Sequence, residues 1–182
     1  MVNYPGGGKR KYKAPVTYAN RGKFFEDSII AANHGYLARG IGFIEKVEPV
    51  IQITQERPPN RVEGFKKGKG FVDFFGCSQG RAIAFEAKKT NSRTSFPLGN
   101  IKDHQMTALR VWQQQGGIAF FLISFEKLGE VYLVKYDQVN EYWEAAEKGG
   151  RKSIPYDYFL LHCDLVKQGR GVPLDYLKCI GI

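Results

Sequence analysis

The stretch GFVDFFGCSQGRAIAFEAK, residues 70–88, has the pattern of two strands joined by a tight turn. Gly70–Gly76 and Arg81–Lys88 are dominated by aromatic, β-branched and other apolar residues, which favour strands. Cys77–Gly80 between them contains serine, glutamine and a final glycine, a composition typical of a turn. We therefore expect these residues to form a β-hairpin.

Asp73, Glu86 and Lys88 are three of the four charged residues on this hairpin. Because side chains alternate along a strand, Glu86 and Lys88 share one face, whereas Phe85 and Ala87 share the opposite, core-facing side. Asp73 is the single acid in an apolar run of the other strand, where burial of an unpaired carboxylate is costly. A hard divalent cation offsets that cost, and Mg²⁺ prefers oxygen ligands. A metal held by Asp73 and Glu86 would activate water for phosphodiester hydrolysis, with Lys88 stabilising the developing charge.

The same side chains also have a structural interpretation. An acid beside apolar residues and a Glu-x-Lys spacing both occur by chance, and a Glu–Lys pair on an edge strand commonly faces solvent. From Asp73, Glu86 and Lys88 alone, the catalytic and the structural interpretations both stay open.

Charge and composition narrow the class of protein. The 182 residues are 43% hydrophobic and 14% aromatic, which suits one compact domain with a packed core. The net charge is +9, and positive residues gather in an N-terminal arm, before the hairpin and directly after it. Each cluster by itself is compatible with a solvated surface. Three clusters on one basic chain favour nucleic acid, whose phosphates would supply most of the affinity.

Other classes are disfavoured. No apolar run approaches the length of a membrane span, and the first residues lack the apolar core of a signal peptide, so we expect a cytoplasmic protein. The three cysteines and three histidines are dispersed and show neither zinc nor disulfide spacing. We therefore expect reduced thiols and no transition-metal centre.

The rest of the chain predicts a mixed α/β domain. Residues 1–16 are expected to form a flexible basic arm, and residues 17–182 a single domain with a sheet of about five strands flanked by helices. Residues 55–70 are rich in proline, glycine and basic residues, which predicts a projecting loop or hairpin. The first helix should begin after Asn20 and stop at Gly35. The expected helices are 21–33, 102 or 103–115, 137–148 (capped by Asp137) and 172–180. The expected extended segments are 41–54 (interrupted near Glu48-Pro49), 70–76, 81–88, 118–125 and 131–136.

A wider set of motifs is spread over most of the chain. In order, they are Asn20-Arg21-Gly22 with Glu26, Asp73, Phe85-Glu86-Ala87-Lys88, Thr94-Ser95-Phe96-Pro97-Leu98, His104-Gln105 and Gly150-Arg151-Lys152-Ser153-Ile154. Together they resemble the RecU-type Holliday junction resolvases of Gram-positive bacteria, members of the PD-(D/E)xK nuclease superfamily. Val72 takes the place of the proline that often precedes the aspartate in that superfamily.

The resemblance implies a restriction-endonuclease-like core and assigns roles residue by residue. Asp73, Glu86 and Gln105 match the family's magnesium ligands, with Mn²⁺ as a substitute ion. Lys88 matches the lysine that stabilises the transition state. Glu26 matches an acid of the first helix that could touch the metal through water. The implied catalytic set is therefore Glu26, Asp73, Glu86 and Lys88.

Two departures from the family pattern stand out. Phe71 occupies the position of a metal-contacting threonine, so that contact is a backbone carbonyl, a water or absent. Residues 55–70 correspond to the family's basic stalk, and they are fewer than in the familiar bacterial members. A compact chain with a shortened stalk fits a divergent or phage-encoded member.

The resemblance also implies partners. Two symmetric cuts need two active sites related by a two-fold axis, so we expect a homodimer on four-way junction DNA. Recombinase or branch-migration proteins would be further partners, in a bacterial cell or a phage-infected host. The candidates for phosphate contacts are Arg21, Lys66, Lys67, Lys69 and Arg93.

The sequence therefore predicts a Mg²⁺-dependent Holliday junction resolvase. Two alternatives stay open. One is a nuclease of the same core that acts on linear or branched duplex, and the other is a DNA-binding recombination protein with an idle catalytic centre.

Overall fold

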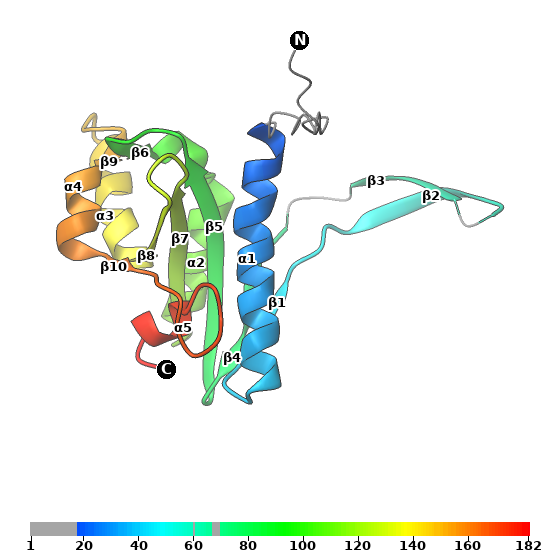
Figure 1. The fold of residues 1–182 in the computed structure, drawn as a ribbon. Coiled ribbons are helices and arrows are strands. Elements are labelled where there is room, and N and C mark those ends of the chain that lie inside the picture. Colours follow the sequence, from blue (N-terminus) through cyan, green and yellow to red (C-terminus); the bar gives the residue numbers. More distant parts are fainter. Residues whose placement is uncertain (1–17, 60, 67–69) are drawn as a thin grey trace, which may run out of the picture.

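The computed structural model describes residues 18–59, 61–66 and 70–182, and a six-stranded mixed sheet forms its centre (Figure 1). Strands β5 and β7 run parallel, whereas the other neighbours in the sheet are antiparallel. The strands, in spatial order, are β1 (Phe43–Lys46), β4 (Phe74–Ser78), β5 (Arg81–Thr90), β7 (Ile118–Phe125), β8 (Glu130–Lys135) and β10 (Asp164–Leu165).

The predicted mixed α/β class is confirmed, and the predicted number of strands is corrected from about five to six. The expected segment 41–54 contains β1 and the start of a strand outside this sheet, and the other four expected segments correspond to β4, β5, β7 and β8. The sixth, β10, has two exposed residues and therefore leaves no hydrophobic pattern in the sequence. Turn residues Gln79 and Gly80 both have positive φ, and β4 extends two residues further into the predicted turn.

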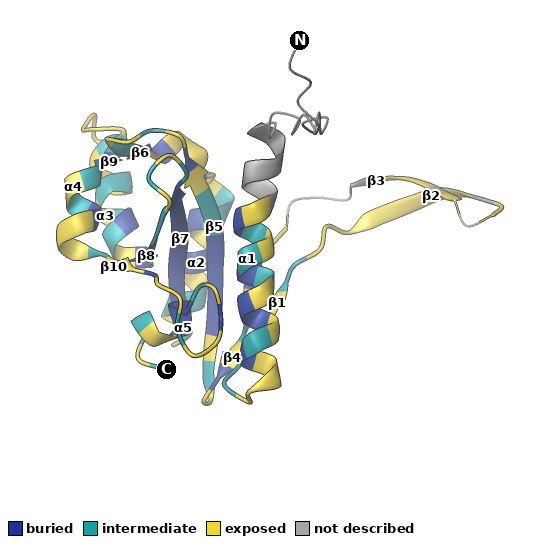
Figure 2. Cartoon of the chain, viewed as in Figure 1, coloured by how far each residue is buried: buried dark blue, intermediate teal, exposed yellow. Residues whose placement is uncertain are grey.

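Helices cover both faces of this sheet. The long α1 (Tyr18–Ala38) lies on one face, and α2 (Asp103–Gln114) and α3 (Tyr136–Glu147) lie on the other (Figure 1). As predicted, β7 is buried on both faces, with seven of its eight residues shielded from solvent (Figure 2). The short helices are η1 (Leu98–Asn100), α4 (Tyr156–His162) and α5 (Tyr176–Cys179).

Helix α1 packs through Phe25, Ile29, Ala32 and Tyr36, a spacing that places all four on one side of a helix. The predicted stop at Gly35 is wrong, because the helix continues to Ala38. A Cβ atom at that glycine would come within 2.4 Å of a methyl group of Val172, so the glycine serves close packing. Asn20, predicted as the cap, lies inside the helix.

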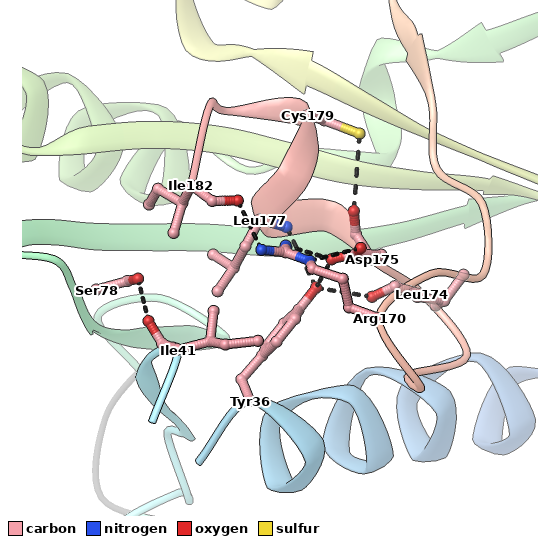
Figure 3. A network of polar contacts seen from close by, with 9 residues as sticks. All are labelled: Tyr36, Ile41, Ser78, Arg170, Leu174, Asp175, Leu177, Cys179 and Ile182. Atoms are coloured by element: carbon pink, nitrogen blue, oxygen red, sulfur yellow. Dashed lines mark hydrogen bonds and ion pairs between the residues drawn. The ribbon is translucent and has the colours of Figure 1, made fainter. Parts of the chain in front are cut away.

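The C-terminal segment is fastened to α1 by a buried polar network (Figure 3). Tyr36 donates a hydrogen bond to Oδ1 of Asp175 (3.0 Å), and Arg170 donates to both oxygens of the same carboxylate. Arg170 also donates to the carbonyl of Ile182 (2.9 Å). The predicted helix 172–180 shortens to α5, because the residues before it form this loop instead. Asp137 is likewise not the cap of α3, which begins one residue earlier.

Two strand pairs lie outside the central sheet. Strands β2 (Ile51–Arg57) and β3 (Arg61–Lys66) form an exposed hairpin that projects from the body (Figures 1 and 2). It begins four residues before the segment in which the sequence predicted a projecting loop or hairpin. Strands β6 (Ser95–Pro97) and β9 (Ser153–Pro155) pair over three residues each, too few to be recognised from the sequence. Residues 1–16, the expected basic arm, lie outside the described residues.

Candidate active site

The pairing of β4 with β5 brings two acids to one place. Phe74 lies opposite Phe85 in the register, so Asp73, directly before β4, reaches the position opposite Glu86. The backbone N–H of Ala87 donates a hydrogen bond to Oδ2 of Asp73 (3.0 Å), which fixes that carboxylate against β5. The two acids singled out in the sequence therefore meet in the structure.

Lys88 lies between these two carboxylates. Its Nζ is 2.7 Å from Oε2 of Glu86 and 3.6 Å from Oδ2 of Asp73. The lysine side chain is 13% exposed, so its ammonium acts where water screens charge poorly. The alternation predicted for β5 is confirmed, because Glu86 and Lys88 do share one face.

The sequence predicted that Asp73 would be the buried acid, and this prediction is wrong. The Asp73 side chain is 41% exposed, whereas the Glu86 side chain is 1% exposed. The reason is that β5 is a central strand covered by α2, while Asp73 precedes β4 nearer the sheet edge. The face of β5 that carries Ala84, Glu86 and Lys88 was expected to be open, but it is part of the core, and Ala84 is fully buried there.

Burial has a strong effect on the protonation of Glu86. Desolvation first, and then the hydrogen bond and the charge of Asp73, raise the pKa of Glu86 to about 8, against an opposing effect of Lys88. Without a bound cation, Glu86 is therefore largely protonated at neutral pH. A cation at this position would favour the charged carboxylate.

Gln105 joins the cluster from the first turn of α2. Its Nε2 donates a hydrogen bond to Oε2 of Glu86, and its Oε1 accepts one from the backbone N–H of Lys102 (3.0 Å). The glutamine therefore caps the helix and touches the buried acid. Only the resemblance identified it, although a glutamine three residues after the start of a helix is itself a capping signal.

Glu26 lies on α1 and faces the edge strand β1. It pairs with Lys46 at 2.7 Å, and Lys46 lies opposite Phe74 in the register of β1 and β4. Hydrogen bonds with Glu26 and then Glu48 raise the pKa of Lys46 above its usual value. Among the contacts of the described residues, Glu26 has none to Asp73, Glu86 or Lys88. Nothing in the sequence pattern singled out Lys46, which the structure places beside Glu26.

The remaining predicted residues are placed apart from the acids. Phe71 is half-exposed, and its ring contacts Trp112 with centroids 5.6 Å apart. Arg93 is exposed in the loop after β5. Arg21 lies in α1 and Lys66 ends β3, but their side chains are outside the described part of the chain, as are Lys67 and Lys69 altogether.

The donor set of this site consists of two carboxylates and one amide. Within the described residues, no group of three or more His, Cys, Asp and Glu side chains is arranged to hold a metal ion. Mg²⁺ is commonly held by one or two carboxylates, with water and substrate phosphate as its other ligands. The residues present therefore fit a magnesium ion better than a zinc ion.

The structure thus brings Asp73, directly before β4, next to Glu86 and Lys88 of β5 in a mixed sheet, an arrangement that resembles the PD-(D/E)xK pattern. The family model described as RecU, recombination protein U, matches residues 20–181. The chain belongs to the RecU family.

Curated relatives agree over nearly the full length. The Holliday junction resolvase RecU of Listeria innocua is 36% identical over 98% of this chain and 96% of the relative. The protein of that name from Geobacillus kaustophilus is 33% identical over 96% and 90%. The solved structure of Archaeoglobus fulgidus Hjc, a Holliday junction resolvase, has a TM-score of 0.39 at 10% identity and covers 64% of this chain and 77% of its own.

Among the described residues, no helix combines the length and apolar character that a membrane crossing needs.

Proposed function

We propose that this chain is a Mg²⁺-dependent endonuclease that resolves four-way DNA junctions by symmetric cuts in homologous recombination and repair. The observation that carries the proposal is the contact of Lys88 with Asp73 and with the buried Glu86. Membership of the RecU family supports the substrate, since the relatives are named Holliday junction resolvases.

Asp73 and Glu86 are the proposed metal ligands. Gln105 is the third candidate, and its amide oxygen, which now accepts a hydrogen bond from Lys102, would have to face the ion. Bound Mg²⁺, or Mn²⁺ in its place, lowers the pKa of a coordinated water and polarises the scissile phosphate. The burial of Glu86 supports this assignment, because a cation offsets the cost of a buried carboxylate.

Lys88 is the proposed charge-stabilising residue. Its ammonium lies beside both acids, and a phosphate brought to them would therefore meet a positive charge that is already in place. Glu26 is proposed to contact the metal ion through a water molecule. Its ion pair with Lys46 holds its carboxylate near the end of β1.

A homodimer is the proposed assembly. Helix α2 leaves one face of β1 and β4 open, and Phe43 and Phe75 are there 50% and 45% exposed. Together with the half-exposed Phe71 and Val111, this open face amounts to about 300–400 Å² of apolar surface, at roughly 200 Å² for a whole aromatic side chain. A standard interface covers about 800 Å² on each partner, so the open face would supply its apolar centre.

The test is cleavage of a labelled mobile four-way junction and a matched linear duplex, each with Mg²⁺ or EDTA. We expect paired nicks in the junction only and with metal only. Equal cutting of the duplex would favour the alternative nuclease, and binding without cleavage would favour an idle catalytic centre.

A further inference from the structure

Two motifs of the sequence that the catalytic cluster does not use lie side by side in the structure. Strand β6 comes from the TSFPL motif and β9 from the GRKSI motif, and they pair beyond the end of β5 (Figure 1). The ladder continues past the strands, because the N–H of Leu98 donates to the carbonyl of Lys152 (3.1 Å). Arg151 and Lys152 therefore lie against η1.

A continuous series of contacts connects this strand pair to the buried acid. Nζ of Lys102 donates a hydrogen bond to the carbonyl of Gly99 in η1 (3.4 Å). The backbone of Lys102 binds Gln105, which in turn donates to Glu86. Asn100, also in η1, donates to the carbonyl of Lys89 (3.2 Å), the residue after Lys88. The pair is thus fixed in position relative to the cluster.

Four exposed cations gather on these segments, and we call them the basic rim: Arg93, Lys102, Arg151 and Lys152. Among the described residues, acid partners belong to Lys46, Lys88, Lys89 and Arg170, which lie outside the rim. Within the described residues, none of the four rim cations forms an ion pair, even with the acids of the same segments. Nε of Arg151 instead donates to the hydroxyl of Ser153 (3.1 Å), which orients its guanidinium group.

We propose that the basic rim binds backbone phosphates of the DNA arm next to the cleaved bond, and thereby places that bond against Glu86 and Lys88. The proposal rests on the proposed nuclease function and extends it to a second contact surface, separate from the projecting hairpin. Cations that contact phosphates fix the register of DNA and read no bases. The rim should therefore strengthen binding to junction and to linear duplex alike.

The test compares two double variants with the same loss of charge. Arg151→Gln/Lys152→Gln removes half of the rim, and Lys167→Gln/Lys178→Gln removes two exposed lysines near the C-terminus. Binding to junction and duplex is measured without Mg²⁺ over a series of salt concentrations. Each lost phosphate contact makes the slope of log K against log salt concentration less negative by about 0.9. At 0.15 M salt this change corresponds to a roughly 5-fold loss of affinity.

For the rim variant we expect about 30-fold weaker binding to both DNA forms and a salt slope smaller by about 1.8. The control variant should keep the wild-type slope, and both should melt at the wild-type temperature. An unchanged slope for the rim variant, or an equal change in the control, would overturn the proposal. If the rim variant shows these changes but the wild-type protein does not cut junctions, the proposed function alone would be overturned.

Discussion

Replacement of Glu86 by glutamine should stabilise the metal-free protein while it abolishes cleavage. The carboxyl group is 1% exposed, and its pKa rises from an ordinary 4.5 to about 8. A group whose pKa is raised on folding contributes full stability below its unfolded pKa and loses that contribution as the pH rises through its folded pKa. At pH 7 the protonation of Glu86 therefore lowers the free energy of unfolding of the wild-type protein, and the Glu86→Gln variant has no such loss.

The size of this loss follows from the distance between pH 7 and the unfolded pKa. At 1.36 kcal/mol for each pH unit, protonation of Glu86 costs about 3 kcal/mol at pH 7. The variant keeps an acceptor for Gln105 but weakens the hydrogen bond that Lys88 donates to the side chain at position 86, which offsets about 1 kcal/mol. The net gain is about 2 kcal/mol, or roughly 4–8 °C in melting temperature for a chain of this size.

The assay is thermal unfolding of wild type, Glu86→Gln and the control Glu147→Gln in EDTA between pH 4 and pH 9. Glu147 is an exposed acid of α3, so its replacement should leave the melting temperature unchanged. The advantage of Glu86→Gln should grow with pH up to about 8, and added Mg²⁺ should reduce it by stabilising the wild type alone. A variant that melts at or below wild type in EDTA at pH 8 would refute the reasoning.

Three further outcomes are expected. Asp73→Asn should abolish cleavage and leave junction binding largely intact, because the acid is assigned to metal; gel-shift and cleavage assays decide this, and full activity with Mg²⁺ would reject the assignment. Deletion of residues 66–69 should lower the preference for junction over duplex in competition binding, and an unchanged ratio would reject a role of the hairpin in junction choice. Phe75→Glu should weaken self-association at least 10-fold in sedimentation experiments, whereas the equally drastic Leu161→Glu on exposed α4 should not; a dimer unaffected by the first change would move the interface elsewhere.

The sequence predicted the core of the fold well because long periodic segments carry strong signals. The limits of β7 were predicted correctly and β5 extends two residues beyond its predicted end, whereas β4 begins four residues later than predicted. Short elements held by tertiary contacts were not predicted correctly. Strands β6 and β9 exist because they pair with each other, and α5 begins only after the loop that binds Arg170 to Asp175.

The site was predicted in composition but not in its electrostatics. Strand alternation and adjacency brought Asp73, Glu86 and Lys88 together correctly. Which acid is buried depends on the cover that α2 provides over β5, and no local pattern reveals that cover. The ion pair of Lys46 with Glu26 likewise joins two elements through tertiary packing.

The central claim is that Asp73 and Glu86 hold a divalent cation, and calorimetric titration of the metal-free protein with Mg²⁺ tests it most directly. At pH 7, in buffers of different ionisation enthalpy, we expect binding to release about one proton, because the pKa of Glu86 is raised to about 8. Asp73→Asn and Glu86→Gln should lose this binding, and Glu147→Gln should keep it. Unchanged binding in the first two variants, with no proton released by the wild type, would contradict the account.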